Sequence, residues 1–239
     1  MLHQSSITNQ LLAALSPNDF ALLQKHLEPV DLQLRQQVVR AGEPMSHVVF
    51  PDSGLLSIVT DIEEGRFEIG MSGWEGFAGV PVVLGVAHTP HTALVQVPGT
   101  GWRIAAQPLR DAMHESDTLT SILLRYVHTF IVQISQTAFA NAAYPLEIRL
   151  ARWILMTHDR SVGDHLLLTH EFLATMLGTG RSGVTFAIQT LEGNSLIRAT
   201  RGRITVRNRE GLEAVAGDAY GLAEREYTKV FQLPLRKDV

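Results

Sequence analysis

The chain has 239 residues, of which 45% are hydrophobic, and a formal net charge of −4 at pH 7. This length and hydrophobic content allow one large or two ordinary domains, and we expect two. The absence of cysteine excludes disulfides, thiolate zinc sites, iron–sulfur clusters and thiol nucleophiles. No run of 18 or more apolar residues occurs, and residues 1–10 lack the basic and apolar regions of a signal peptide. We therefore expect a cytoplasmic protein with no membrane partner.

Charge is divided unevenly along the chain. Residues 1–144 contain 7 basic and 13 acidic side chains, whereas residues 145–239 contain 13 and 11. One segment of the second part carries six arginines against a single acid, Glu192. The six are Arg181, Arg198, Arg201, Arg203, Arg207 and Arg209. DNA binding needs such a local positive field, so the distribution favours a sensor attached to a DNA reader.

Residues 9–27 are expected to be helical. Ser16 is a good N-cap, Pro17 suits the first helical position, and Asp19 places an acid in the first turn. From Pro29 to about Ile104 the hydrophobic period changes to two, beginning with the alternating Val30, Leu32 and Leu34.

The apolar runs between Pro29 and Ile104 are short, recur about every ten residues and end at turn residues such as Ala41–Pro44 and Pro98–Gly101. Strands at this spacing, without intervening helices, favour a small β-barrel or jelly roll. We therefore predict a β-roll sensor domain over residues 1–116, which encloses space for one small ligand.

Helical spacing returns from Pro108 to Ala143, and a continuous helix is expected over Asp117–Ala143. One apolar stripe comprises Leu119, Leu123, Tyr126, Phe130 and Ile134, broadened on the side facing the roll by Ile122, Val127 and Ile131. The helix would be roughly 40 Å long, too long for one small roll to cover. We therefore expect residues 117–144 to pair with a second copy and form a homodimer. The alternative is a long helix buried against its own domain.

Pro145 breaks the chain and suggests a hinge before a helix from Leu146 to about Thr157. The segment His158–His165 holds two histidines and two aspartates besides Arg160, but no pair has the helical spacing of a metal site. We predict a polar loop there and no metal. The tail over residues 219–239 is mixed in charge and is expected to be frayed.

Residues 168–209 predict a winged helix-turn-helix, within a domain over residues 145–218. Thr169 is an N-cap for a short helix that ends at Gly178. After the turn Gly178–Gly180, a second helix buries Val184, Ile188 and Leu191 at helical spacing. Its opposite face carries Arg181, Ser182, Thr185, Phe186 and Gln189. Two helices joined by a three-residue turn containing glycine place the second helix in the DNA major groove.

A hairpin follows the second helix and extends the pattern. Ile197–Arg198 and Arg203–Val206 flank a turn at Gly202, which is typical of a wing. The predicted DNA-binding residues are Thr169, Arg181, Ser182, Thr185, Phe186, Gln189, Arg201 and Arg203. The alternative structure is a short helical hairpin with a solvated basic face.

The segment LTHEFLATMLGTGRSGVTFAIQTLEGNSLI resembles a pattern of the cAMP receptor protein and fumarate/nitrate regulator (Crp/Fnr) superfamily, LTxxxLAxxLGxSRxxVxxxLxxLxxxxLI. Shared positions are Leu168, Thr169, Leu173, Ala174, Leu177, Gly178, Arg181, Val184, Leu191, Leu196 and Ile197, with Ile188 in place of Leu. The N-terminal LLAALSPNDFALLQKHLEPVDL and the turn AGEP are also similar.

This resemblance covers nearly the whole chain. It implies an α+β fold of N-terminal β-roll, long dimerisation helix and C-terminal winged helix-turn-helix. It also implies a homodimeric transcription regulator that binds double-stranded DNA, with RNA polymerase as a further partner.

Two departures from the family carry information. Members that read a TGTGA-type half-site use an Arg-Glu pair and a second Arg one turn later, where this chain has Arg181, Ser182 and Phe186. Arg181 retains the bidentate contact to guanine, but Ser182 cannot accept from cytosine as Glu does, and Phe186 offers only apolar contact. The resemblance therefore implies a different DNA site.

The second departure lies in the effector pocket. Cyclic-nucleotide binders of the family carry Gly-Glu and, about ten residues later, Arg-Ser/Thr; this chain has Gly79-Val80 and His91-Thr92. A buried phosphate without arginine costs several kcal/mol, so cyclic nucleotides are disfavoured and the effector stays unidentified. His47, His88 and His91 are not expected to ligate haem. No cofactor is predicted.

The leading prediction is a dimeric DNA-binding regulator. The alternative is a ligand-binding β-roll whose C-terminal domain binds a protein partner rather than DNA. An enzyme is not expected, because the sequence shows no nucleophile elbow, phosphate loop or metal-ligand spacing.

Overall fold

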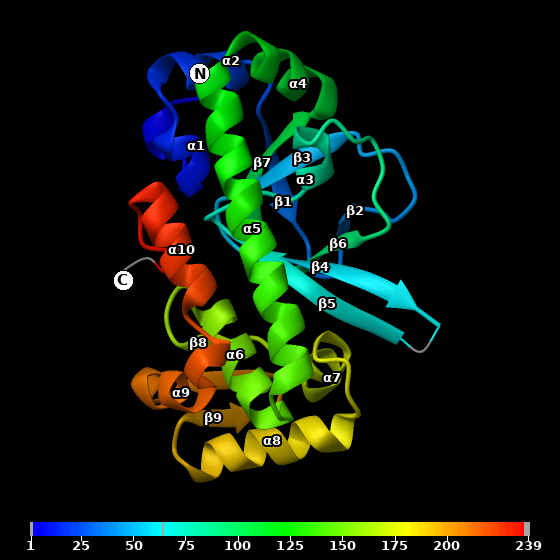
Figure 1. Cartoon of the computed structure of the whole chain (residues 1–239), viewed down its shortest axis with the longest axis vertical. Helices are drawn as coiled ribbons and strands as arrows, with labels where there is room; N and C mark the ends of the chain where they lie inside the picture. The colour runs from blue at the N-terminus through cyan, green and yellow to red at the C-terminus, as the bar shows by residue number, and fades with distance from the viewer. Residues whose placement is uncertain (1, 64, 237–239) are drawn as a thin grey trace. The chain divides into compact units, whose positions relative to one another are not determined.

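The computed structural model describes residues 2–63 and 65–236, and the chain divides into two compact units. The first runs to residue 60 and from 71 to 128; the second comprises residues 61–70 and the chain from 129 onward. Figure 1 labels the elements of both. Within the described residues, no helix is long and apolar enough to cross a membrane.

The first unit begins with a 3₁₀ turn, η1 (Gln4–Ser6), and the helices α1 (Gln10–Ala14) and α2 (Pro17–Gln24). The side chain of Asn9 accepts hydrogen bonds from the first turn of α1, and Ser16 accepts one from Asp19 N. The expectation that residues 9–27 are helical is confirmed for residues 10–14 and 17–24, and so are the Ser16 cap and the position of Pro17. Leu15 and Ser16 have extended backbone, and each short helix has its own N-cap.

Seven strands follow and form two sheets, with strand orders β1-β7-β3 and β2-β6-β4-β5. Their bounds are β1 Glu28–Leu32, β2 Gln37–Val39, β3 His47–Pro51, β4 Leu55–Ile62, β5 Gly65–Ser72, β6 Thr92–Val97 and β7 Gly99–Ala105. The pairings of β7 with β1 and β3, and of β6 with β2 and β4, are antiparallel. The predicted β-roll is confirmed.

Details of the roll differ from the sequence expectation. A short helix, α3 (Val80–Val83), interrupts the strand series. The residues 98–101, expected to be a turn, lie largely in β7, which pairs with β1 from Gly99 onward. Leu34, the last residue of the predicted alternation, is 58% exposed because β1 ends at Leu32. Glycine and proline thus did not mark every turn correctly.

Helix α4 (Ala106–Glu115) leads into α5 (Asp117–Ala143), the longest helix of the structure (Figure 1). Leu119, Leu123 and Tyr126 of the predicted apolar stripe are buried. Tyr126 stacks on Phe77 and donates a hydrogen bond from its hydroxyl to Ser72 Oγ at 2.9 Å. Ile131, expected to face the roll, is instead 56% exposed. This part of α5 therefore presents an apolar face that its own chain does not cover.

The second unit contains α6 (Leu146–His158) and the helix pair α7 (His170–Met176) and α8 (Arg181–Gly193). A small antiparallel sheet of order β8-β10-β9 follows, with bounds β8 His165–Leu166, β9 Ile197–Thr200 and β10 Arg203–Val206. The wing hairpin is as predicted, but β8 was not foreseen, since two residues are too short to show a period. The core is apolar and includes Leu150, Ile154, Leu173, Val184, Leu191, Ile204 and Leu212.

Beyond the wing the chain forms α9 (Arg209–Ala216), η2 (Gly217–Ala219) and α10 (Leu222–Phe231). Tyr227 is 2% exposed and Leu235 is 6% exposed. The expectation of a frayed tail from residue 219 is therefore wrong for residues 219–236, because Tyr227 and Leu235 anchor the segment. Residues 237–239 of that expectation lie outside the described residues.

Candidate nucleic-acid interface

The first helix of the pair, α7, begins as its sequence predicts. Thr169 has extended backbone, and its hydroxyl accepts a hydrogen bond from Phe172 N at 3.1 Å. Leu173 and Met176 point into the core. Because the N-cap hydroxyl satisfies one of the free N–H groups of the first turn, it fixes where α7 starts.

The turn after α7 is held from two directions within the second unit. Gly178 has φ +59°, and a Cβ at this position would lie 2.0 Å from the ring of Phe67, at the end of the β4–β5 hairpin. The guanidinium of Arg149 on α6 donates to the carbonyl oxygen of Leu177 and, through Nε, to Asn141 Oδ1 at 2.9 Å. Next to this turn, the indole N–H of Trp153 donates to Glu68 Oε1 at 2.8 Å. These contacts fix the angle at which α8 leaves α7.

Helix α8 has one buried and one exposed face, as predicted. Val184, Ile188 and Leu191 are at most 2% exposed. Arg181, Ser182 and Gln189 are exposed, and Phe186 is 63% exposed. The Phe186 ring adds little to the core and is available on the same face as Arg181, Ser182 and Gln189.

Thr185 differs from the other residues predicted for this face, because its hydroxyl is already engaged. It donates to the carbonyl oxygen of Arg181 at 3.0 Å and lies 3.0 Å from Nδ1 of His170. Since the hydroxyl proton is used inside α8, His170 is the donor and carries its proton on Nδ1. His170 thereby fixes the start of α7 to α8. Sequence analysis missed this contact, because the two residues share no motif.

A groove of about 580 Å³ runs between the start of α7, the exposed side of α8 and the wing. Five of the predicted DNA-binding residues line it: Thr169, Arg181, Thr185, Gln189 and Arg201. Ser182 and Phe186 are exposed on α8 outside this lining, and Arg203 is exposed on β10. The eight residues thus lie on one helix pair and its wing rather than in a single pocket.

The register of the wing explains where its arginines point. Ile204 pairs with Ala199 and Val206 with Ile197, and this face of the hairpin is turned to the core. Arg198 and Arg203 alternate with these residues and are exposed. Arg201 stands at the tip beside Gly202, whose φ of +74° forms the turn.

Arg209, which the sequence analysis counted in the basic segment, is not free to bind DNA. Its Nη2 donates to Asp159 Oδ1 at 2.7 Å, and its Nε lies 2.8 Å from Glu213 Oε1. It also donates to the hydroxyl oxygen of Tyr220 and to Nδ1 of His158. Burial lowers the pKa of Arg209, but Asp159, Tyr220 and Glu213 together raise it above its ordinary value. The charge of Arg209 is therefore neutralised by ion pairs within the second unit.

The segment His158–Arg160 was expected to be part of a polar loop, but these three residues are at most 2% exposed. His158 accepts from Arg209 at Nδ1, so its proton is on Nε2, which donates to Asp164 Oδ1 at 2.9 Å. Burial lowers the pKa of His158, and this outweighs the opposing effect of its bond to Asp164. The residues join α6 to α9. Within the described part of the chain, no three His, Asp or Glu side chains are grouped as metal ligands.

The remaining five arginines of the segment form the positive surface of this region. Arg181, Arg198, Arg201, Arg203 and Arg207 are exposed, and none has an ion pair with another described residue. Unpaired guanidinium groups are available to phosphate oxygens and to guanine edges. The geometry therefore supplies an exposed helix, a hairpin beside it and uncompensated positive charge.

Residues 148–215 match the family model of the Crp-like helix-turn-helix domain. Residues 148–215 therefore form a Crp-like helix-turn-helix domain. The helix-turn-helix part of the resemblance is thereby confirmed. No curated protein matches the sequence.

Solved structures of Crp/Fnr-family regulators share the fold of this chain. A crp/fnr-family regulator of Eubacterium rectale, described as putative in its name, is 17% identical with a TM-score of 0.68, covering 86% of this chain and 97% of its own. FixK2 of Bradyrhizobium japonicum is 15% identical with a TM-score of 0.67, covering 81% and 99%. A CRP/FNR-family regulator of Thermus thermophilus is 20% identical with a TM-score of 0.65, covering 79% and 98%. At these identities the comparison shows a shared fold.

The residues expected to form the effector pocket of the regulator lie on different parts of the roll. Gly79, with φ +110°, precedes α3, and the preceding residue Ala78 pairs with Val49 of β3. Thr92 begins β6 in the other sheet, pairs with Val59 and is 3% exposed. His91 N donates to Thr89 Oγ1 at 3.2 Å, and Val80 begins α3. Gly79 and Val80 thus lie at the start of α3, and His91 and Thr92 lie at the start of β6.

Proposed function

We propose that this regulator binds double-stranded DNA as a homodimer, with the exposed face of α8 in the major groove and the wing on the phosphate backbone. The observation that carries the proposal is the groove between α8 and the wing, which Arg181 and Arg201 line, together with the exposed Arg198, Arg203 and Arg207 on or next to the wing. Phosphate neutralisation supplies much of the affinity of such proteins. Base readout then comes from the side chains that α8 presents.

Within α8, the first turn carries the specificity. Arg181 is exposed at the start of the helix, and the residues of a recognition helix nearest its N-terminus are those that reach base edges. A guanidinium binds guanine O6 and N7 in a bidentate manner, whereas Phe186 offers an apolar surface to a thymine methyl group. Arg201 and Arg203 on the wing suit phosphate contacts, which are independent of sequence.

Dimerisation is supported by a face of α5 that was not the one expected from the sequence. Its exposed residues recur with alternating spacings of three and four: Ser121, Leu124, His128, Ile131, Ser135, Ala138 and Ala142. This is the period of a two-stranded coiled coil. Leu124 is 42% exposed and Ile131 56% exposed, so the centre of the stripe is apolar. The stripe that includes Leu119 is buried within the chain, and the second copy is assigned to this other face.

We propose further that the β-roll binds an effector other than a cyclic nucleotide. Gln96 is 3% exposed, its Oε1 accepts from Ser57 Oγ, and its Nε2 has no hydrogen-bond partner among the described residues. A buried amide N–H without a partner costs about 1–3 kcal/mol, which a polar ligand in the roll would offset. Val80 and His91 replace the Glu and Arg with which cyclic-nucleotide binders hold ribose and phosphate, so this ligand is not a cyclic nucleotide. RNA polymerase is the further partner of a regulator that acts on transcription.

A mobility-shift titration at several salt concentrations tests the DNA-binding part. Arg181→Ala should weaken specific binding by about 1–3 kcal/mol. Arg201→Ala should weaken binding to all sequences alike and lower the slope of log K against log salt by about 0.9. Arg40→Ala is the matched control, because Arg40 is an exposed arginine of the roll with a side chain 62% accessible. If Arg40→Ala weakened DNA binding as much as Arg181→Ala, α8 would not be the DNA-reading helix. If the C-terminal domain bound a protein and no DNA, the alternative of a protein-binding module would replace this proposal.

A further inference from the structure

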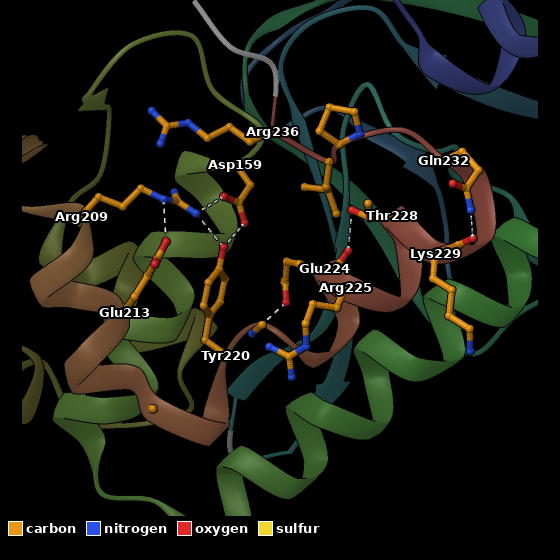
Figure 2. A pocket seen from close by; sticks show the side chains of 14 residues that line it. Asp159, Arg209, Glu213, Tyr220, Glu224, Arg225, Thr228, Lys229, Gln232 and Arg236 are labelled. Carbon is orange, nitrogen blue, oxygen red and sulfur yellow. Dashed lines mark hydrogen bonds and ion pairs between the residues drawn. The ribbon is translucent and has the colours of Figure 1, made fainter.

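A second hollow in the same unit lies between α9 and α10 and has a volume of about 710 Å³ (Figure 2). The lining comprises Asp159, Arg209, Glu213, Gly217, Tyr220, Gly221, Glu224, Arg225, Thr228, Lys229, Gln232, Pro234, Leu235 and Arg236. Most of these residues follow residue 215, where the match to the Crp-like domain ends. The cavity is therefore built chiefly by a C-terminal extension of that domain.

The side chains along one wall of the cavity form ion pairs and hydrogen bonds with one another. Tyr220 donates its hydroxyl proton to Asp159 Oδ2 at 2.7 Å, and Arg209 bonds Asp159, Tyr220 and Glu213 (Figure 2). Every charged group of this wall has a partner of opposite sign. The wall thus supplies shape and the face of an aromatic ring, and its one guanidinium is already paired with two carboxylates, so it offers no free positive charge to an anionic ligand.

Two arginines of the cavity have no such partner. Arg225 and Arg236 make no ion pair with any described residue. Figure 2 shows them at opposite edges of the cavity, with Tyr220 and Glu224 between them. Glu224 forms no ion pair with either one, and its Oε2 instead accepts a hydrogen bond from Gly221 N at 3.0 Å. The unpaired charge is therefore positive and located at two separated points.

We propose that this cavity is a binding site for a small organic molecule with an anionic group at each end, such as a dicarboxylate or a bisphosphate. Arg225 and Arg236 hold the two anionic groups, and the ring of Tyr220 contacts the body of the molecule. A volume of 710 Å³ lies within the range of about 300–1,000 Å³ typical of small-molecule sites. Guanidinium groups suit both carboxylate and phosphate, because their planar fork of donors matches either anion.

Isothermal titration of the full-length chain without DNA tests this site, using glutarate and fructose 1,6-bisphosphate as probes and acetate as the monovalent control. Saturable binding of at least one probe at millimolar concentration or below is expected, with no comparable binding of acetate. Binding of glutarate would identify the ligand as a dicarboxylate, and binding of fructose 1,6-bisphosphate would identify it as a bisphosphate. Because no DNA is present, the result is independent of the proposed DNA-binding function.

Substitution locates the binding. Arg225→Gln and Arg236→Gln should each weaken binding of that probe about tenfold, since each removes one charge-assisted contact. Arg201→Gln, which removes an exposed wing arginine outside the cavity, should leave binding unchanged. Circular dichroism of each variant checks that it is folded. Because Arg225 is exposed, Arg225→Gln should stay folded, and this variant tests the site even if Arg236→Gln does not fold. Absence of saturable binding by both probes, or binding that survives Arg225→Gln, overturns the proposal.

Discussion

Replacing Gly178 by alanine tests how the helix-turn-helix is held. The residue has φ +59°, and a Cβ would lie 2.0 Å from Phe67 Cε1. The left-handed backbone costs an alanine about 1–2 kcal/mol. Displacing a packed ring costs about 1–3 kcal/mol more. Gly178→Ala should therefore destabilise the second unit by about 3 kcal/mol.

The two costs separate in a double-mutant cycle with Phe67→Ala. Without the ring the clash disappears and only the backbone cost remains, so Gly178→Ala should then cost about 1–2 kcal/mol. The coupling of roughly 1–3 kcal/mol is within the range for residues in contact. Urea unfolding is followed by the fluorescence of Trp153, which lies in the second unit, with Trp74 and Trp102 replaced by phenylalanine throughout.

Gly193→Ala is the matched control for this cycle. Gly193 is the last residue of α8, and a Cβ there would meet nothing within 4 Å. The change should be neutral or stabilise by up to about 1 kcal/mol, because alanine favours the helix. If the costs of Gly178→Ala and Phe67→Ala were simply additive, the hairpin end would not contact the turn and the reasoning would fail.

Three further results are expected. Burial lowers the pKa of His158 below its unfolded value of about 6.5. The free energy of unfolding should therefore fall as the pH falls from about 6.5 to the folded pKa, by at most about 1.4 kcal/mol per pH unit. Urea unfolding from pH 8 to 5 checks this, and the same pH dependence in His158→Gln would show that His158 is not its cause. Asp159→Ala removes one of the two carboxylates that pair with Arg209 and leaves Glu213 as the other, so it should destabilise by about 1–3 kcal/mol in the same assay. No measurable loss would contradict the network. Ile131→Glu on the exposed stripe of α5 should give monomers in sedimentation at micromolar concentration. Arg125→Glu, beside the stripe, is the control and should remain dimeric. If Ile131→Glu remained dimeric, the dimer interface would not be this stripe.

The helix-turn-helix and its wing were predictable because their signals are local. The Thr169 cap, the glycines of the turn and the helical spacing of Val184, Ile188 and Leu191 lie within a few residues of the features they determine. The exposed face of α8 follows from the same spacing. A short stretch of sequence therefore specified both the helix and its exposed side.

Contacts distant in sequence were not predictable. Arg209 looked like one more basic residue of the wing region, and only the fold brings Asp159 and Tyr220 to it. Periodicity likewise located α5, but it did not distinguish the stripe that the chain buries from the stripe it leaves exposed. Nor did the local sequence show that the end of the β4–β5 hairpin belongs to the second unit.

Selection of bound sequences from random duplex DNA tests the central claim most directly. The wild-type chain should select a site with two-fold symmetry, whose half-sites are about one helical turn, roughly 34 Å, apart. Arg181→Ala should select a site of the same symmetry that has lost its preference at one base pair of each half-site. A selected site without a dyad, or an unchanged preference in Arg181→Ala, would contradict the dimeric, α8-based reading of DNA.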